Sequence, residues 1–349
     1  WDGYKWQPVG EPYVPYTIIP APTCLPTLPD LRMTVYNLGV DAAKLNADYP
    51  GLSPAKQQIA YQANNTLIET DATVLGDLYQ WGRMRDGHEK RNSSTYPGPL
   101  TLPDEVDDNG QPKAGKGQGQ FILVPEDGVN DWYKPRNNTL WGNGQVAGYN
   151  FGSADGGAVP GSGGYYQKPV KTVNDPCPLG WRIPTQDEWE RLLNYGCGAP
   201  QIAIGDSVSI ASSEYYKSLS SLTNGITNAP LTWVRIKEGK AFAGTLATGY
   251  QSGYAIYETD VWTAAAIGYK DGTNNLYDPA APEPILFLPI NGFHNRVTGM
   301  LDNIGNTGHY WSSTVSNAST YYPTIQRYEL FSVLTGSRAY GFGVRCVKE

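Results

Sequence analysis

Residues 175–193, DPCPLGWRIPTQDEWERLL, place a cysteine between two prolines shortly before a helix start. Thr185 and Glu188 have the spacing of a capping box, in which each side chain satisfies a backbone N–H that the first helical turn leaves unpaired. The prolines keep the approach around Cys177 extended, because a residue before proline avoids helical backbone angles. One buried helix face is predicted from the apolar spacing of Trp189, Leu192 and Leu193. A short helix docked through a tryptophan is therefore expected just after Cys177.

The chain ends in GFGVRCVKE, in which Phe342, Val344 and Cys346 alternate with other residues as on one face of a β-strand. A disulfide between Cys177 and Cys346 would attach the helix approach to this last strand. The alternative is that the cysteines are buried free thiols, since free cysteine is among the most buried residue types. A secreted protein favours the disulfide, because such bonds persist in oxidising compartments.

Composition points to such a compartment. The 349 residues include 40 Gly, 27 Pro and 25 Tyr, and only 17% are charged, which is typical of loops and short strands rather than of a helical enzyme. The formal charge of -7 argues against nucleic acid as a partner. The sequence contains no apolar run long enough to span a membrane. A start at Trp1 fits either a removed signal peptide or a sequence that begins partway along a longer protein. We expect an extracellular or outer-membrane-surface protein.

Residues 1–30 form a proline-rich N-terminal arm, for which a helix is excluded and an edge strand in YVPYTIIP is expected. Its large apolar and aromatic side chains favour burial, either along its own domain or on a neighbouring subunit of a filament. Packing on its own domain is the favoured alternative. A second disulfide between Cys24 and Cys197 would then hold the arm against the body.

Residues 31–349 are predicted to form one domain, with loop insertions at about 92–171 and 198–285 where Gly-rich turn sequences dominate. A second helix is expected to start at Ser53, with Pro54 in its first position. Toward the C-terminus, ILFLPI, HYWSST and AYGFGVRCV alternate as short strands. Two main helices, short antiparallel strands and long loops together predict an α+β fold.

Several of these segments together resemble the Fibrobacter succinogenes major paralogous domain, a surface-protein module of Bacteroidota and Fibrobacteres. The resemblance rests on DPCPLGWRIPTQDEWERLL, GHYWSST and GFGVRCVKE, with VYNLGVDAA and GDLYQWGRMRDGHE upstream, and it covers the chain from about residue 31 onward. Val35 and Tyr36 stand where that family usually has Asp and Arg. The resemblance implies a C-type-lectin-like fold, distantly related to formylglycine-generating enzymes. In such folds the first helix and the last strand are joined by a disulfide, which again implies the bond between Cys177 and Cys346.

The sequence offers little catalytic or metal-binding chemistry. Its histidines, His88, His294 and His309, lie in different segments without metal-ligand spacing. GQPKAGKG at 110–117 lacks the Ser or Thr of a phosphate-binding loop. YWSST stands where calcium-dependent lectins have Trp-Asn-Asp, so the oxygen ligands of calcium are not assembled. No catalytic residue, metal ligand or cofactor is assigned.

The sequence favours a secreted or cell-surface bacterial adhesion or fimbria-associated protein, which recognises a glycan or protein ligand through long loops on a disulfide-stapled scaffold. Fimbrial or filament subunits are further candidate partners. In NGFHNR, the residues His294, Asn295 and Arg296 are candidate ligand-binding residues on an exposed loop, although a polar turn without a ligand is the alternative. Trp132 and Trp141 fit either a recognition surface or the core. A glycan-binding module of a polysaccharide-uptake system and a formylglycine-generating-type enzyme are the alternative functions.

Overall fold

The computed structural model describes residues 14–20, 30–125, 128–142, 170–192, 231–241, 250–258, 283–316, 319–326 and 332–349. Within these ranges the helices are few and short, and the strands pair into several mainly antiparallel sheets. The predicted α+β class is therefore confirmed. The predicted pair Cys24 and Cys197 lies outside the described residues.

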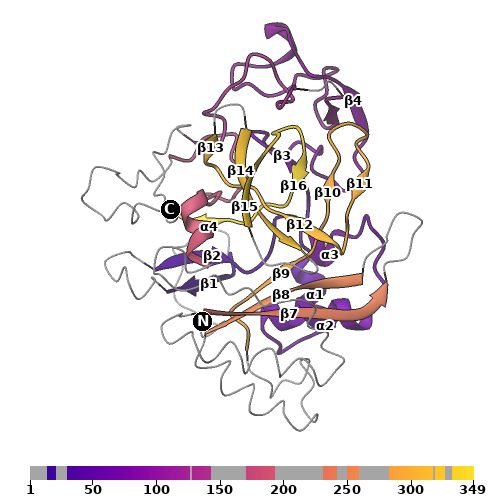
Figure 1. Cartoon of the computed structure of the whole chain (residues 1–349), viewed down its shortest axis with the longest axis vertical. Coiled ribbons are helices and arrows are strands. Elements are labelled where there is room, and N and C mark those ends of the chain that lie inside the picture. The colour runs from indigo at the N-terminus through magenta and orange to yellow at the C-terminus, as the bar shows by residue number, and fades with distance from the viewer. Residues whose placement is uncertain are drawn as a thin grey trace.

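One four-stranded sheet brings distant parts of the chain together. Its strands, in spatial order, are β1 (Tyr16–Ile19), β2 (Leu31–Thr34), β17 (Val347–Lys348) and β6 (Trp181–Arg182). β1 is an edge strand that pairs antiparallel with β2 along its whole length, as Figure 1 shows. This part of the proline-rich arm therefore packs on its own domain, in the edge position that proline tolerates.

The remaining sheets are built mainly from the C-terminal half. A second four-stranded sheet has the order β11 (Leu301–Asp302), β10 (Phe293–His294), β16 (Gly341–Phe342) and β3 (Tyr79–Gln80). A third contains β12 (Thr307–His309), β14 (Ser319–Gln326), β13 (Val315–Ser316) and β15 (Ser332–Gly336). A three-stranded sheet consists of β7 (Leu231–Ala241), β8 (Tyr250–Glu258) and β9 (Leu286–Pro289). The one parallel pair among the described strands is β4 (Thr95–Pro97) with β5 (Phe121–Leu123).

The two predicted main helices are present in the structure. α2 (Pro54–Asn64) begins with proline, and the side chain of its N-cap Ser53 accepts a hydrogen bond from the backbone of Lys56. α4 (Gln186–Leu192) follows the predicted capping box. Shorter helices that the sequence reading missed are α1 (Ala42–Asp48), α3 (Ala72–Leu75) and the 3₁₀ helix η1 (Pro103–Glu105). α2 packs beside the β7–β8–β9 sheet at the bottom of the view in Figure 1.

The buried side chains form two large clusters. The first is rich in aromatic rings and includes Trp81, Trp132, Trp141, Trp311 and both cysteines of the described chain. The second is mainly aliphatic and joins β2, α4, β8 and β9. Each tryptophan of the first cluster is almost fully buried. The reading of Trp132 and Trp141 as recognition residues is therefore wrong, because their indole N–H groups are also used inside, on the carbonyls of Trp81 and Arg83.

The C-terminal segment contributes side chains to both clusters. Its alternation determines which cluster each side chain joins. Phe342, Val344 and Cys346 belong to the aromatic cluster, whereas Val347 belongs to the aliphatic one. Arg345 points to the second side and donates to the backbone carbonyls of Val35 and Phe287. The predicted shared face of the last segment is confirmed, although regular strand structure is interrupted between β16 and β17.

Candidate functional site

The predicted disulfide joins Cys177 to Cys346 across 169 residues of sequence. Both sulfur-bearing residues are buried, at 5% and 0% exposure. The Asp175 carboxylate supports the approach, because it accepts hydrogen bonds from the backbone N–H groups of Cys177 at 2.8 Å and Ile183 at 3.0 Å. The bond therefore ties a preorganised loop to the end of the chain.

The helix start beside the disulfide is equally complete. The backbone N–H of Glu188 donates to the Thr185 hydroxyl at 3.2 Å, and the N–H of Thr185 donates to the Glu188 carboxylate at 2.9 Å, so the predicted capping box is confirmed. The same carboxylate forms a bidentate ion pair with Arg182, with N–O distances of 2.7 and 2.6 Å. Both partners are buried. The charged groups of the junction are therefore paired with one another inside the protein.

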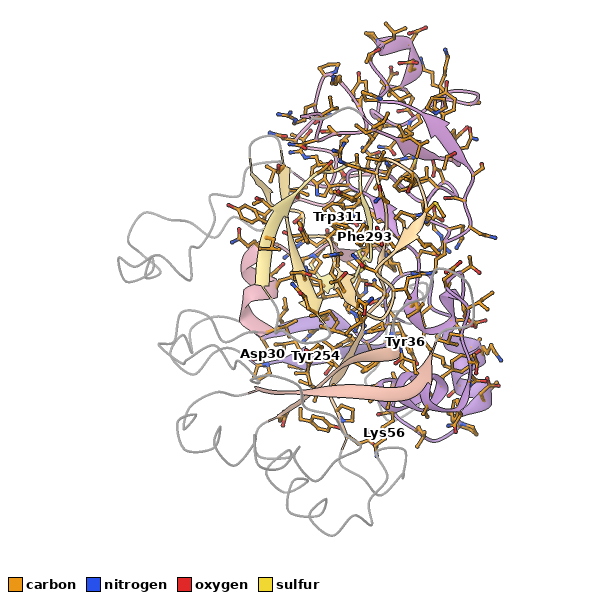
Figure 2. The ribbon with its side chains drawn as sticks, turned by 45° about the vertical axis from the view of Figure 1, so that its right-hand side comes forward. Asp30, Tyr36, Lys56, Tyr254, Phe293 and Trp311 are labelled. Carbon is orange, nitrogen blue, oxygen red and sulfur yellow. A yellow bond between two sulfur atoms is a disulfide. The ribbon has the colours of Figure 1, made fainter. Side chains whose placement is uncertain are left out.

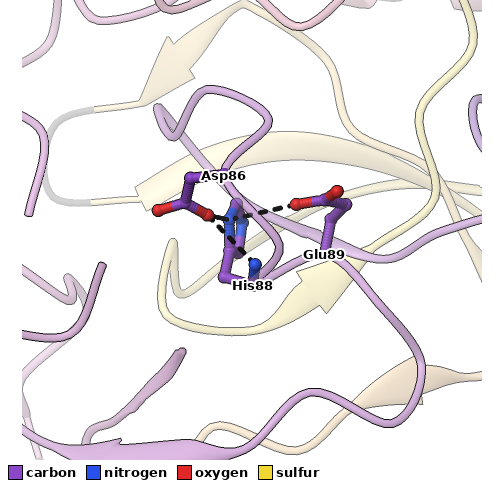
Figure 3. A group of neighbouring side chains, drawn as sticks. All are labelled: Asp86, His88 and Glu89. Carbon is purple, nitrogen blue, oxygen red and sulfur yellow. Dashed lines mark hydrogen bonds and ion pairs between the residues drawn. The ribbon is translucent and has the colours of Figure 1, made fainter. Parts of the chain in front are cut away.

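A group of metal-ligating residue types, Asp86, His88 and Glu89, lies in the loop after β3 (Figure 3). The His88 Nε2 accepts a hydrogen bond from the backbone N–H of Gln80 at 3.1 Å. Its Nδ1 must therefore carry the proton, which it donates to Asp86 Oδ1 at 2.6 Å. Burial lowers the pKa of His88 to about 4, so the ring is neutral near pH 7. A metal ion would have to displace both hydrogen bonds.

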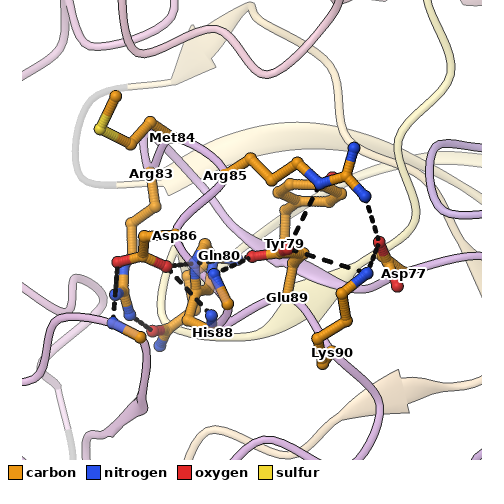
Figure 4. Close-up of polar contacts among 12 residues, drawn as sticks. Asp77, Tyr79, Gln80, Arg83, Met84, Arg85, Asp86, His88, Glu89 and Lys90 are labelled. Carbon is orange, nitrogen blue, oxygen red and sulfur yellow. Dashed lines mark hydrogen bonds and ion pairs between the residues drawn. The ribbon is translucent and has the colours of Figure 1, made fainter.

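The charges around this group also disfavour a cation. Asp86 Oδ2 is 2.7 Å from the buried guanidinium of Arg83, while Arg85 and Lys90 lie near Glu89 (Figure 4). The carboxylates are thus already neutralised by basic side chains, and a metal site does not fit the residues present. The network instead fixes the loop that follows β3 against the buried Gln80.

The candidates in NGFHNR are held by three different parts of the molecule. His294 is 1% exposed, and its Nδ1 lies 3.0 Å from the carbonyl oxygen of Gly299. The prediction that His294 lies on an exposed loop is wrong, because β10 pairs with β16 and buries the ring. The Asn295 side chain accepts from Val297 within the turn, and the Arg296 guanidinium donates to the Val124 carbonyl. Ligand binding by Asn295 and Arg296 stays a prediction.

Half-buried rings gather instead around the side chain of Phe342. We define the aromatic face as Phe293, His309, Tyr322 and Tyr340, each partly exposed. Their ring centroids lie 6.1, 4.7, 4.8 and 5.7 Å, respectively, from that of Phe342. The ring of the fully buried Trp311 packs against Phe342, with ring centroids 4.2 Å apart. Trp311 and Phe293 are labelled in Figure 2. The rings are therefore fixed by packing on one another.

One polar atom of the aromatic face stands out among the described residues. The Nδ1 of His309 is buried and has no hydrogen-bond partner among the described residues. Burial lowers the pKa of His309 to about 4 and raises the pKa of Tyr322, so both rings are uncharged at neutral pH. Other buried atoms of the described chain, such as both side-chain polar atoms of Gln62, share this feature, so the nitrogen supports a ligand here only together with the surrounding rings.

Sequence reasoning missed the aromatic face because its members come from four separate segments. Phe293 lies on β10, His309 on β12, Tyr322 on β14, and Tyr340 in the turn before β16. The available signal was the recurrence of aromatic residues in FHNR, GHYW, TYYPT and AYGF. Only the pairing of the sheets shows that these rings share a surface.

Comparison of the chain with known protein families, with curated proteins and with solved structures finds no match. Among the described residues, none of the helices is both long and apolar enough to cross a bilayer.

Proposed function

We propose that this chain is a bacterial surface-recognition protein of the adhesion or fimbria-associated kind, and that its ligand contacts the aromatic face. The carrying observation is the set of four half-buried rings packed on Phe342. Aromatic side chains with a polar tip combine a large contact area with hydrogen bonding and lose little conformational entropy on binding. Membership of the Fibrobacter succinogenes major paralogous domain family, a C-type-lectin-like fold and an extracellular location belong to the same proposal.

The scaffold supports this role because the aromatic face rests on rigid elements. Trp311 donates from its indole N–H to the Tyr79 carbonyl, and Phe342 lies in the segment that the disulfide holds four residues later. A recognition surface gains affinity when its side chains are already in place before the ligand binds. The same arrangement suits a protein or a glycan ligand.

A glycan-binding module of a polysaccharide-uptake system is the second candidate. It is favoured by the uncharged rings and by the unpaired Nδ1 of His309. A sugar ring has an apolar side that stacks on aromatic rings and hydroxyl groups that hydrogen-bond to polar atoms beside them. An enzyme of the formylglycine-generating type finds no support among the described cysteines, since Cys177 and Cys346 are buried and bonded to each other.

A glycan array and a cell-adhesion assay test the proposal. Tyr322→Ala and Tyr340→Ala should each reduce ligand binding, whereas Tyr16→Ala, a matched change at a half-buried tyrosine on β1, should not. Glycan binding that is lost in the two face variants would favour the second candidate. Adhesion that persists unchanged in both face variants would contradict the assignment of the aromatic face.

A further inference from the structure

A small pocket lies in the segment 128–136, within the first predicted insertion. Its volume is about 190 Å³. Pockets for drug-sized ligands are usually larger, about 300–1,000 Å³. The size therefore suits one small polar unit, such as a single sugar ring.

The polar floor of the pocket is the carboxylate of Asp131, which is 5% exposed. Its Oδ2 lies 3.3 Å from the guanidinium of Arg338 and 3.9 Å from Nε of Arg136. The backbone N–H of Tyr133 donates to Oδ1 at 3.4 Å. These contacts are long, so the carboxylate keeps acceptor capacity.

The Asp131 carboxylate is held in place by Arg338, which is itself fixed by several contacts. The guanidinium of Arg338 lies 4.3 Å from the centroid of the Trp81 ring and donates to Asn138 Oδ1 at 2.6 Å. The backbone N–H of Arg338 also donates to the carbonyl of Asn130, a lining residue, at 2.8 Å. A buried, charge-paired floor of this kind is preorganised for a ligand.

The charge of the described lining favours an anion. Arg338 neutralises Asp131 from inside, whereas Arg136 and Lys134 both line the pocket and are exposed. The Arg136 side chain is 41% exposed, and its Nε lies 3.9 Å from the Asp131 carboxylate. An arginine guanidinium presents parallel N–H groups that match a carboxylate. The half-buried Tyr133 adds an aromatic wall.

One turn of the chain has residues that contact both regions. Arg338 supports the pocket floor, and Tyr340, two residues later, belongs to the aromatic face. The Cα atoms of residues two apart are separated by at most about 7 Å.

We infer that this pocket binds an acidic monosaccharide unit, of the hexuronate class, within a glycan that continues across the aromatic face. The inference rests on the glycan form of the proposed function. The sugar carboxylate lies on Arg136, ring hydroxyls donate to Asp131, and the apolar side of the ring faces Tyr133. Binding should weaken with added salt, because an exposed arginine makes the charged contact.

The test uses the whole chain, a panel of uronate-containing oligosaccharides and the same oligosaccharides with each carboxylate reduced to an alcohol. Wild-type protein should prefer the acidic forms. Arg136→Gln should lower affinity for them by about tenfold and leave the neutral forms unchanged, since one charge-assisted contact is lost. Arg32→Gln, at an exposed arginine on β2, is the matched control. Tyr322→Ala should weaken both forms equally.

Two results would overturn the inference in distinguishable ways. The pocket inference is wrong if the wild-type protein binds acidic and reduced forms with equal affinity, or if Arg136→Gln keeps the preference for acidic forms. Either result would leave glycan binding at the aromatic face intact. Binding to neither form would remove the glycan form of the proposed function, and the pocket inference with it.

Discussion

The disulfide junction and the aromatic face differ in how completely their polar groups are paired. At the junction, Glu188 serves the helix cap and the buried ion pair with Arg182 at once. On the aromatic face, Nδ1 of His309 is buried without a partner among the described residues. At the junction the charged groups are paired with one another, whereas on the aromatic face the rings are uncharged at neutral pH and a ring nitrogen of His309 has no partner among the described residues.

This difference separates stability from recognition. Removing one partner from a satisfied buried pair leaves the other charged and unpaired, which strongly destabilises a protein. Removing a ring from a half-buried surface costs some packing but leaves no buried charge behind. We therefore expect changes at the junction to act on folding, and changes at the aromatic face to act mainly on binding.

Loss of the disulfide should have the largest effect. For cysteines 169 residues apart, the chain-entropy model assigns about 5 kcal/mol of stability to the bond. The double variant Cys177→Ser and Cys346→Ser should therefore lower the free energy of unfolding, measured by urea denaturation, by an amount of that order. The fraction that remains folded should still bind ligand through the aromatic face. Normal stability in the double variant would show that the junction does not hold the fold.

The buried ion pair should rank next. Glu188→Ala leaves Arg182 buried without its partner and also removes the reciprocal cap, so we expect a loss of about 3–5 kcal/mol in the free energy of unfolding. Asp48→Ala breaks the exposed pair with Lys44 on α1 and serves as the control, with no measurable change expected. Equal effects of the two substitutions in urea denaturation would contradict the assigned role of the buried pair.

Acid should destabilise the protein through its buried histidines. The pKa of His88 is lowered from 6.5 to about 4, so in that window the unfolded chain binds a proton that the folded protein excludes. The free energy of unfolding should therefore fall as the pH drops from about 6.5 to about 4, by up to about 3 kcal/mol for this ring alone. Urea denaturation at a series of pH values measures the slope. A flat profile would show that His88 is not buried in its neutral form.

At neutral pH, replacing single histidines with phenylalanine compares a histidine whose ring is hydrogen-bonded, His88, with one on the aromatic face, His309. His88→Phe leaves the backbone N–H of Gln80 without its acceptor and removes one of the two hydrogen bonds that Asp86 Oδ1 accepts from residue 88, and should cost about 1–3 kcal/mol. His309→Phe removes a ring nitrogen that has no hydrogen-bond partner among the described residues, and should change the free energy of unfolding little. Thermal melts at pH 7 distinguish them. A greater loss of stability for His309→Phe than for His88→Phe would show that the His309 ring stabilises the fold.

The smallest effect on stability is expected at the aromatic face itself. Tyr340→Ala removes one stacked contact with Phe342, and such aromatic pairs contribute about 0.5–1.5 kcal/mol. Ligand binding should fall far more than this loss of stability implies. The ratio is measured by comparing denaturation with binding on the same preparation. Unchanged binding with lowered stability would make the aromatic face an ordinary part of the core.

Local patterns in the sequence determined the elements whose physics is local. The capping box at Thr185, the start of α2 at Ser53 and the alternation before Cys346 could be predicted because caps and strand faces depend on residues a few positions apart. The bond between Cys177 and Cys346 was also predicted, from the extended approach around Cys177, the alternation around Cys346 and the family resemblance, against the alternative of free thiols. The short helices α1 and α3 were missed, although Asp41 and Asp71 cap them.

Only the tertiary structure decided which residues share a surface. His294 appeared to follow a buried strand into an exposed turn, but pairing of β10 with β16 buries it. The rings of the aromatic face come from segments whose spacing carries no common period, and the pocket at Asp131 depends on Arg338 from the other end of the chain. The physical reason is that sheet pairing and side-chain burial depend on contacts between distant residues, which local periodicity does not encode.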